Sequence, residues 1–93
     1  MGRLLGVYKD PRSFFERYIF VLPYPSRPYS IPPMRVYVGV SADGSRFTVG
    51  EAVYYKDGRK NRHLGRRIKM SQVPKRVKKT FEEILTKIEE EER

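Results

Sequence analysis

The sequence predicts an α+β fold in which an antiparallel β-sheet of three to four strands is followed by one long C-terminal α-helix. Three observations lead to this expectation. Apolar residues alternate with other residues from position 34 onward, glycine-containing turns separate the alternating runs, and apolar residues recur every three or four positions near the C-terminus. We expect the chain to divide at residue 33. Residues 1–33 would form a Pro/Tyr-rich N-terminal extension with a Pro-rich arm, and residues 34–93 would form the folded domain.

The extension allows two interpretations of its first half. Asp10 followed by Pro11 resembles a helix cap with proline at the first helical position, which favours a short helix. The aromatic and β-branched residues of Tyr18 to Leu22 favour a strand instead. From Pro23 to Pro33, five prolines predict a stiff, polyproline-like arm, either a connector lying across the domain or a ligand for an SH3-type module.

The first two strands of the domain are predicted from alternation. Valines alternate with Arg35 and Tyr37 over residues 34–40, and an Asp-Gly pair at 43–44 is a strong hairpin signal. A second alternating run over residues 46–55 should therefore pair antiparallel with the first. Gly50 interrupts this run and favours a bulge or bend, so that either Tyr54 or Tyr55 faces outward.

A third strand, over residues 62–70, is expected after a turn at 56–58. Ser71 is a suitable N-cap for a helix over residues 73–91, and Pro74 is tolerated in the first turn of a helix. The apolar stripe of this helix is longer than a small sheet is expected to cover, which predicts a homodimer through the helix. The expected interface residues are Val77, Phe81, Ile84, Leu85 and Ile88.

Composition limits the function classes. The 93 residues carry a net charge of +9, which attracts polyanions, and they include no Cys and a single His. Thiolate chemistry and histidine clusters are therefore excluded, no catalytic motif is found, and we expect a binding protein that uses no cofactor. No apolar run is long enough for a signal peptide or a membrane span, so a cytoplasmic, nucleoid-associated protein is expected. Low Asn and Gln content beside many Arg and Lys fits a thermophile.

The basic residues concentrate between positions 34 and 72, where aromatic residues accompany them. Basic side chains follow phosphates and aromatic rings stack on bases, so this combination favours single-stranded nucleic acid as the ligand. The candidate binding residues are Arg35, Tyr37, Arg46, Tyr54, Lys56, Arg59, Lys60, Arg62, Arg66, Arg67 and Lys69. His63 is expected on the same ridge as Arg67 and Lys69.

Residues 34 to about 89 resemble the positive cofactor four family of transcriptional coactivators. The similarity lies in the opening Met34-Arg35, the turn glycine Gly44 and the run Leu64-Gly-Arg-Arg-Ile-Lys-Met70. It implies a curved sheet backed by one helix, a homodimer, and single-stranded DNA bound without sequence preference. It places Tyr54 at the position of the family's stacking tryptophan. The chain departs from the family at Glu51, where the family has a basic residue.

Other partners fit the same composition. Thermophilic archaeal single-stranded-DNA-binding proteins with a sheet-and-helix domain share the ligand class. A structural RNA-binding component of a ribonucleoprotein particle, such as a ribosomal accessory protein, is the alternative of a different class. The Pro-rich arm also allows an adaptor that docks on the transcription machinery.

Overall fold

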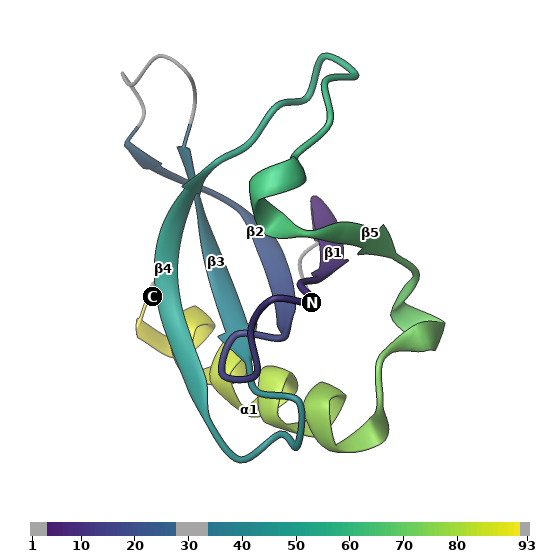
Figure 1. Ribbon diagram of the computed structural model, residues 1–93. Coiled ribbons are helices and arrows are strands. Elements are labelled where there is room, and N and C mark those ends of the chain that lie inside the picture. The colour runs from purple at the N-terminus through teal and green to yellow at the C-terminus, as the bar shows by residue number, and fades with distance from the viewer. Residues whose placement is uncertain (1–3, 28–33, 92–93) are drawn as a thin grey trace.

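The protein, in a computed structural model that describes residues 4–27 and 34–91, forms one five-stranded antiparallel sheet followed by one helix. The strands lie in the order β4-β3-β2-β1-β5. The sheet is curved, and the helix lies across one of its faces (Figure 1). The elements are β1 (Gly6–Lys9), β2 (Tyr18–Arg27), β3 (Met34–Val40), β4 (Phe47–Val53), a 3₁₀ turn η1 (Arg62–Leu64), β5 (Arg66–Ile68), a second 3₁₀ turn η2 (Met70–Gln72) and α1 (Lys75–Glu91). The predicted α+β class is confirmed.

The boundary expected at residue 33 is wrong, because strands from both sides of it form one sheet. β1 and β2 lie between β3 and β5, so the N-terminal residues supply strands from the interior of the sheet and raise the strand number to five. Residues 18–22 are a strand, as one of the two interpretations held. Phe14 and Phe15 lie in the β1–β2 loop, where both are exposed and pack edge to face.

The Pro-rich segment begins inside β2. Its residues 23–27 belong to the strand, and the register between β2 and β3 shifts between Val21 and Pro25 and again between Pro25 and Arg27. Proline cannot donate a ladder hydrogen bond, which explains an irregular pairing at this end of a central strand. The rest of the expected arm, residues 28–33, lies outside the described residues.

The predicted hairpin of β3 and β4 is present. Its pairs run without a shift from Met34↔Val53 to Val40↔Phe47, so the bulge expected at Gly50 is wrong. Gly50 lies opposite Tyr37, and a Cβ atom at Gly50 would come within 2.8 Å of the Tyr37 ring. The glycine therefore provides room for an aromatic ring that crosses the strand.

The third predicted strand is shorter than expected and lies elsewhere. β5 contains only residues 66–68, and it pairs with β1 at the opposite edge of the sheet from β4. The flanking residues form η1 and η2 instead of continuing the strand. Alternation of apolar residues predicted the strand, whereas its partner is set by a contact between residues about sixty positions apart.

α1 covers one face of the sheet. Its stripe packs on apolar side chains of β1, β2 and β3, and Phe81 stacks on Phe20 with ring centroids 4.1 Å apart. The helix residues in this core are Val77, Phe81, Ile84 and Leu85, with Ile88 packed at its margin. The dimer interface expected at the first four of these residues is wrong, because the chain's own sheet buries them. The homodimer itself stays a prediction. Within the described residues, no helix combines the length and the apolar character needed to span a membrane.

The other face of the sheet carries a smaller apolar cluster. It contains Tyr8, Ile19, Val21, Tyr54 and Leu64, and so joins β1, β2, the end of β4 and η1. Tyr54 continues the regular alternation of β4, which places it on the face away from α1. Other side chains cover that face at Tyr54, which is only 6% exposed, so Tyr54 is not the outward ring of the two alternatives, and its expected role as the stacking residue is wrong.

Candidate functional site

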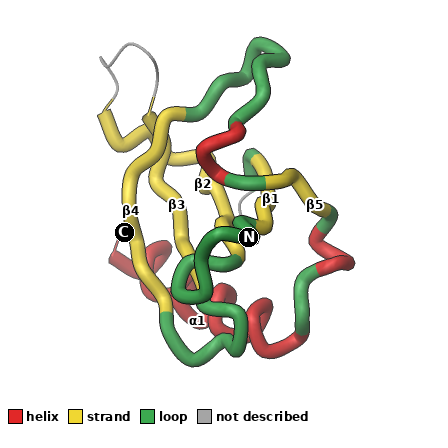
Figure 2. The backbone as a smooth tube through the Cα atoms, viewed as in Figure 1, coloured by secondary structure: helices red, strands yellow, loops and turns green. Residues whose placement is uncertain are grey.

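The segment between β4 and β5, residues 54–65, projects from one end of the sheet as a loop that ends in η1 (Figure 2). The buried side chain of Asn61 closes this loop. Its Oδ1 accepts a hydrogen bond from the backbone N–H of Tyr55 (2.9 Å), and its Nδ2 donates to the Tyr55 carbonyl (3.3 Å). Nδ2 also lies 3.5 Å from the Tyr8 hydroxyl. One amide thus anchors the loop at both ends and links it to β1.

A stacked pair lies on this loop. The Arg59 guanidinium lies 4.4 Å from the centroid of the Tyr55 ring, and its Nη2 donates to Oδ2 of Asp57 at 2.7 Å. The Arg59 hydrogen bonds lower the pKa of Asp57. Tyr55 is partly exposed, whereas Tyr54 is buried, so Tyr55 presents the accessible aromatic ring.

The base of the site is held together by the backbone carbonyl of Leu5. It accepts hydrogen bonds from the Tyr54 hydroxyl (2.7 Å) and from Nη2 of Arg67 (3.3 Å). Tyr8 lies beside them and pairs with Arg67 across β1 and β5. Burial, and next the neighbouring Tyr54, raises the pKa of Tyr8, so this hydroxyl keeps its proton at neutral pH. Arg67 is exposed and is therefore both anchored at the base and accessible to a ligand.

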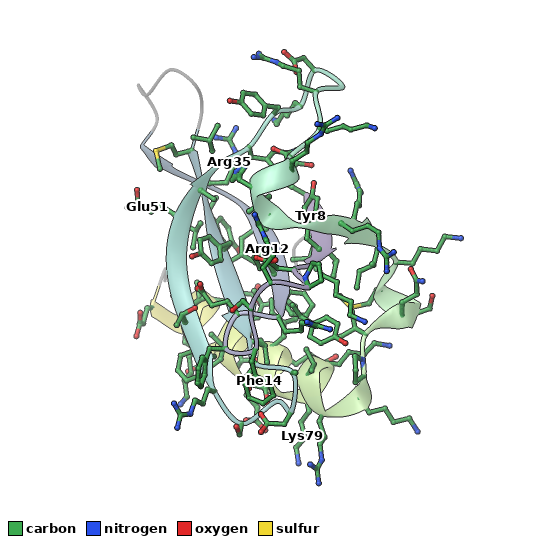
Figure 3. The ribbon with its side chains drawn as sticks, in the orientation of Figure 1. Tyr8, Arg12, Phe14, Arg35, Glu51 and Lys79 are labelled. Atoms are coloured by element: carbon green, nitrogen blue, oxygen red, sulfur yellow. The ribbon has the colours of Figure 1, made fainter. Side chains whose placement is uncertain are left out.

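These groups surround a pocket of about 520 Å³, which we call the basic pocket. It is lined by Tyr8, Tyr54, Tyr55, Lys56, Gly58, Arg59, Lys60, Asn61, Arg62, Gly65, Arg66 and Arg67. Half of these residues are Lys or Arg and none is Asp or Glu. Figure 3 shows Tyr8 on the sheet beside the end of the loop, with nitrogen-tipped side chains on the same side of the molecule. The pocket is therefore suited to an anion that carries a flat ring.

Most sequence-predicted binding residues meet in this pocket. Those that line it are Tyr54, Lys56, Arg59, Lys60, Arg62, Arg66 and Arg67. Tyr54 supplies its buried base, whereas the others stand in the exposed parts of the loop and of β5. Concentrated positive charge in one short segment was the signal that identified them.

The remaining predicted residues lie outside the pocket. Arg35 donates to the carbonyl of Met34 (2.9 Å), and the Tyr37 hydroxyl donates to Oε1 of Glu16 (3.1 Å). Burial, and next Glu16, raises the pKa of Tyr37. Arg46 stands over the Phe15 ring at 5.1 Å. Figure 3 places Arg35 near the loop and Phe14 at the far end of the sheet.

The expected ridge of His63, Arg67 and Lys69 is wrong, because these residues do not share one strand. His63 lies in η1 and its Nε2 donates to the carbonyl of Val53 (2.7 Å). Lys69 follows β5 and is exposed, but it does not line the basic pocket. Of the three, only Arg67 lines the basic pocket.

Sequence reasoning did not identify Tyr8 or Asn61 as site residues. Tyr8 reaches the pocket through the pairing of β1 with β5, which no local pattern predicts. Asn61 is the only asparagine in the chain, and it directly follows the basic pair Arg59-Lys60. That position was the one feature of the sequence that could have indicated its role in the loop.

The arrangement offers cations, hydroxyl groups and one accessible ring. Within the described residues, no three His, Asp or Glu side chains gather into a group that could hold a metal ion. No family model, curated protein or solved structure significantly matches this chain. The resemblance to the positive cofactor four family stays a prediction.

Proposed function

We propose that the protein binds single-stranded nucleic acid without sequence preference, and that it does so at the basic pocket. The observation that carries this proposal is the lining of the pocket, where six Lys and Arg residues stand around the accessible Tyr55 ring and only Arg59 among them forms an ion pair, with Asp57, within the described residues. Cations of this kind pair with phosphates of any sequence, and an aromatic ring stacks on any base. The protein acts by binding and not by catalysis, in transcription or genome maintenance.

In the proposed complex, a base stacks on the Tyr55–Arg59 pair. Tyrosine rings and guanidinium planes both serve as stacking surfaces for unpaired bases. The adjoining phosphates lie against Arg66 and Arg67 at the base of the pocket and against the lysines of its rim. Paired bases expose no free face for stacking, so single strands should bind more tightly than duplex of the same length.

The direct test is a titration of labelled single-stranded DNA, single-stranded RNA and duplex at two salt concentrations. We expect both single strands to bind more tightly than duplex. The logarithm of the binding constant should fall linearly with the logarithm of the salt concentration, with a slope of about −0.7 per phosphate contact. Equal affinity for single strands and duplex would contradict the stacking step.

A first prediction concerns the stacking residue. Tyr55→Ala should weaken binding of single strands by about 1–3 kcal/mol, while Tyr55→Phe keeps most of the affinity, because stacking needs the ring and not the hydroxyl. Binding is measured by fluorescence anisotropy, with thermal unfolding as a check on the fold. Phe47→Ala is the matched control, since Phe47 is an exposed aromatic residue on β4 outside the pocket. Equal losses for the two alanine variants would exclude Tyr55 as the stacking ring.

A second candidate function is a structural RNA-binding role in a ribonucleoprotein particle. The observation in its favour is a second cationic surface at the start of α1, where Lys75, Arg76 and Lys79 are exposed and the first turn holds no acidic residue. Cations at a helix start oppose the helix dipole, so a polyanion beside them would offset that cost. Tighter binding of folded RNA than of unstructured RNA of equal length would favour this role.

A further inference from the structure

A pair of like charges stands opposite one another at the edge of the sheet. Lys9 on β1 is the direct cross-strand partner of Arg66 on β5. Side chains of directly paired residues lie on the same face, and like charges at such positions destabilise a sheet. An anion between the two side chains would convert the repulsion into attraction.

These two residues belong to a second, smaller pocket, which we call the edge pocket. It has a volume of about 250 Å³ and is lined by Lys9, Pro11, Arg17 and Arg66. Three of its four residues are cations. The nearest carboxylate in sequence, that of Asp10, accepts three hydrogen bonds from Arg12 at 2.9–3.3 Å, and those bonds are the main cause of its lowered pKa.

Arg17 is held in place at the edge pocket. Its Nη1 donates to the carbonyl of Pro11 (3.0 Å), and its own carbonyl accepts from the backbone N–H of Asp10 (2.8 Å). Lys9 has its Nζ 5.9 Å from the centroid of the Tyr18 ring. Neither cation has an ion pair among the described residues, although the charge of Arg17 is one of the smaller causes of the lowered pKa of Asp10. Both cations lie at the base of the β1–β2 loop. The cations of the edge pocket thus remain available to an anion.

Arg66 lines both the edge pocket and the basic pocket, so the two are neighbours across β5. We propose that the edge pocket binds a phosphate of the same nucleic-acid strand whose base stacks in the basic pocket. Lys9, Arg17 and Arg66 hold this phosphate, and the strand crosses the short β5 at Arg66. This proposal rests on the proposed function, and it assigns the direction in which the strand leaves the basic pocket.

The test is the affinity of Lys9→Gln, Arg17→Gln and the double variant for an oligothymidylate of eight nucleotides over a range of salt. Each single variant should bind about three- to tenfold more weakly, with a salt slope shallower by about 0.7. The double variant should lose no more slope than either single variant, because both residues hold one phosphate. Lys87→Gln is the control, since Lys87 is exposed on α1 and lines neither pocket.

Lys9→Glu separates stability from binding. It places opposite charges at the cross-strand pair, so it should raise the Tm by about 1–4 °C and at the same time weaken binding more than Lys9→Gln does. A lower Tm would show that Lys9 and Arg66 do not repel one another, and would overturn the proposal.

The outcomes distinguish the two proposals. If Lys9→Gln and Arg17→Gln bind as the wild type does while Arg67→Gln and Tyr55→Ala lose affinity, the edge pocket is overturned and the basic pocket stands. If none of these variants changes binding, or the wild type binds no single strand, the proposed function fails and the edge-pocket proposal fails with it. Loss in the edge-pocket variants together with the basic-pocket variants supports both.

Discussion

Asn61 shows how one side chain can determine the shape of a site. It is one of two polar residues, with Ser41, that are buried in the described part of the chain. Its amide satisfies both backbone groups of Tyr55, which has no strand partner. A buried backbone group without a partner costs about 1–3 kcal/mol, so the loop depends on this side chain for its closed form.

At this scale we expect Asn61→Ala to lower the free energy of unfolding by about 1–3 kcal/mol, because it leaves backbone groups of Tyr55 unpaired. Binding of single strands should weaken as well, since Tyr55 loses its fixed position. Asn61→Asp retains the acceptor but not the donor, and should fall between the wild type and the alanine variant. Urea unfolding measures stability. Gln72→Ala is the control, since it removes one exposed hydrogen-bond acceptor. If Asn61→Ala lowers the free energy of unfolding by no more than Gln72→Ala does, the anchoring role of Asn61 is refuted.

Among the elements, the β4–β5 connection is shaped by two glycines with left-handed backbones. Gly58 has a φ of 88° and Gly65 a φ of 102°. A Cβ atom at Gly58 would meet nothing within 4 Å, whereas one at Gly65 would lie 2.5 Å from the carbonyl oxygen of Lys9. Gly65 therefore brings η1 and β5 into close contact with the end of β1, which is where the two pockets meet.

The two glycines make a matched pair for mutation. Gly58→Ala should cost about 1–2 kcal/mol, the penalty for an L-residue in the left-handed region. Gly65→Ala should cost about 1–3 kcal/mol more, because the added methyl group forces the β1 backbone to move. Chemical denaturation of both variants checks the difference. If both variants lower the free energy of unfolding equally, the β1 backbone can move away from Gly65 without a loss of stability.

Sequence patterns predicted the elements whose partners are close in the chain. The β3–β4 hairpin follows from its alternation and its Asp-Gly turn, and the stripe of α1 follows from a spacing of three and four. The pairing of β1 with β5 could not be predicted, because it joins short segments about sixty residues apart. The same limit explains the error at Tyr54, whose side of the strand was right but whose cover comes from Leu5, Tyr8 and Leu64.

In the molecule as a whole, positive charge favours binding and opposes folding. A net charge of +9 on 93 residues repels itself in the compact state, while it attracts a polyanion from solution. The predicted site residues were found from this charge, which composition reveals. The sheet order, which composition does not reveal, places Arg66 beside Tyr8 of the basic pocket and beside Lys9 and Arg17 of the edge pocket.

Salt should therefore have opposite effects on the free protein and on its complex. Raising sodium chloride from about 0.05 to about 0.5 M shortens the screening length severalfold, so the Tm of the free protein should rise. Affinity for single strands should fall over the same range. Thermal scans and anisotropy titrations in the same buffers measure both. A free protein whose Tm falls with salt would show that its attractive ion pairs outweigh its self-repulsion.

The antiparallel contact between β1 and β5 also fixes when the site can come into existence. A contact between residues far apart in the chain closes a long loop, which lowers the entropy of the chain, so such contacts form late in folding. The pockets lie on both sides of this contact, and β5 is synthesised about sixty residues after β1. A chain still on the ribosome and lacking Arg66–Ile68 carries most of the sheet but neither complete pocket. Nucleic acid that binds at these pockets thus distinguishes the finished molecule from its nascent form.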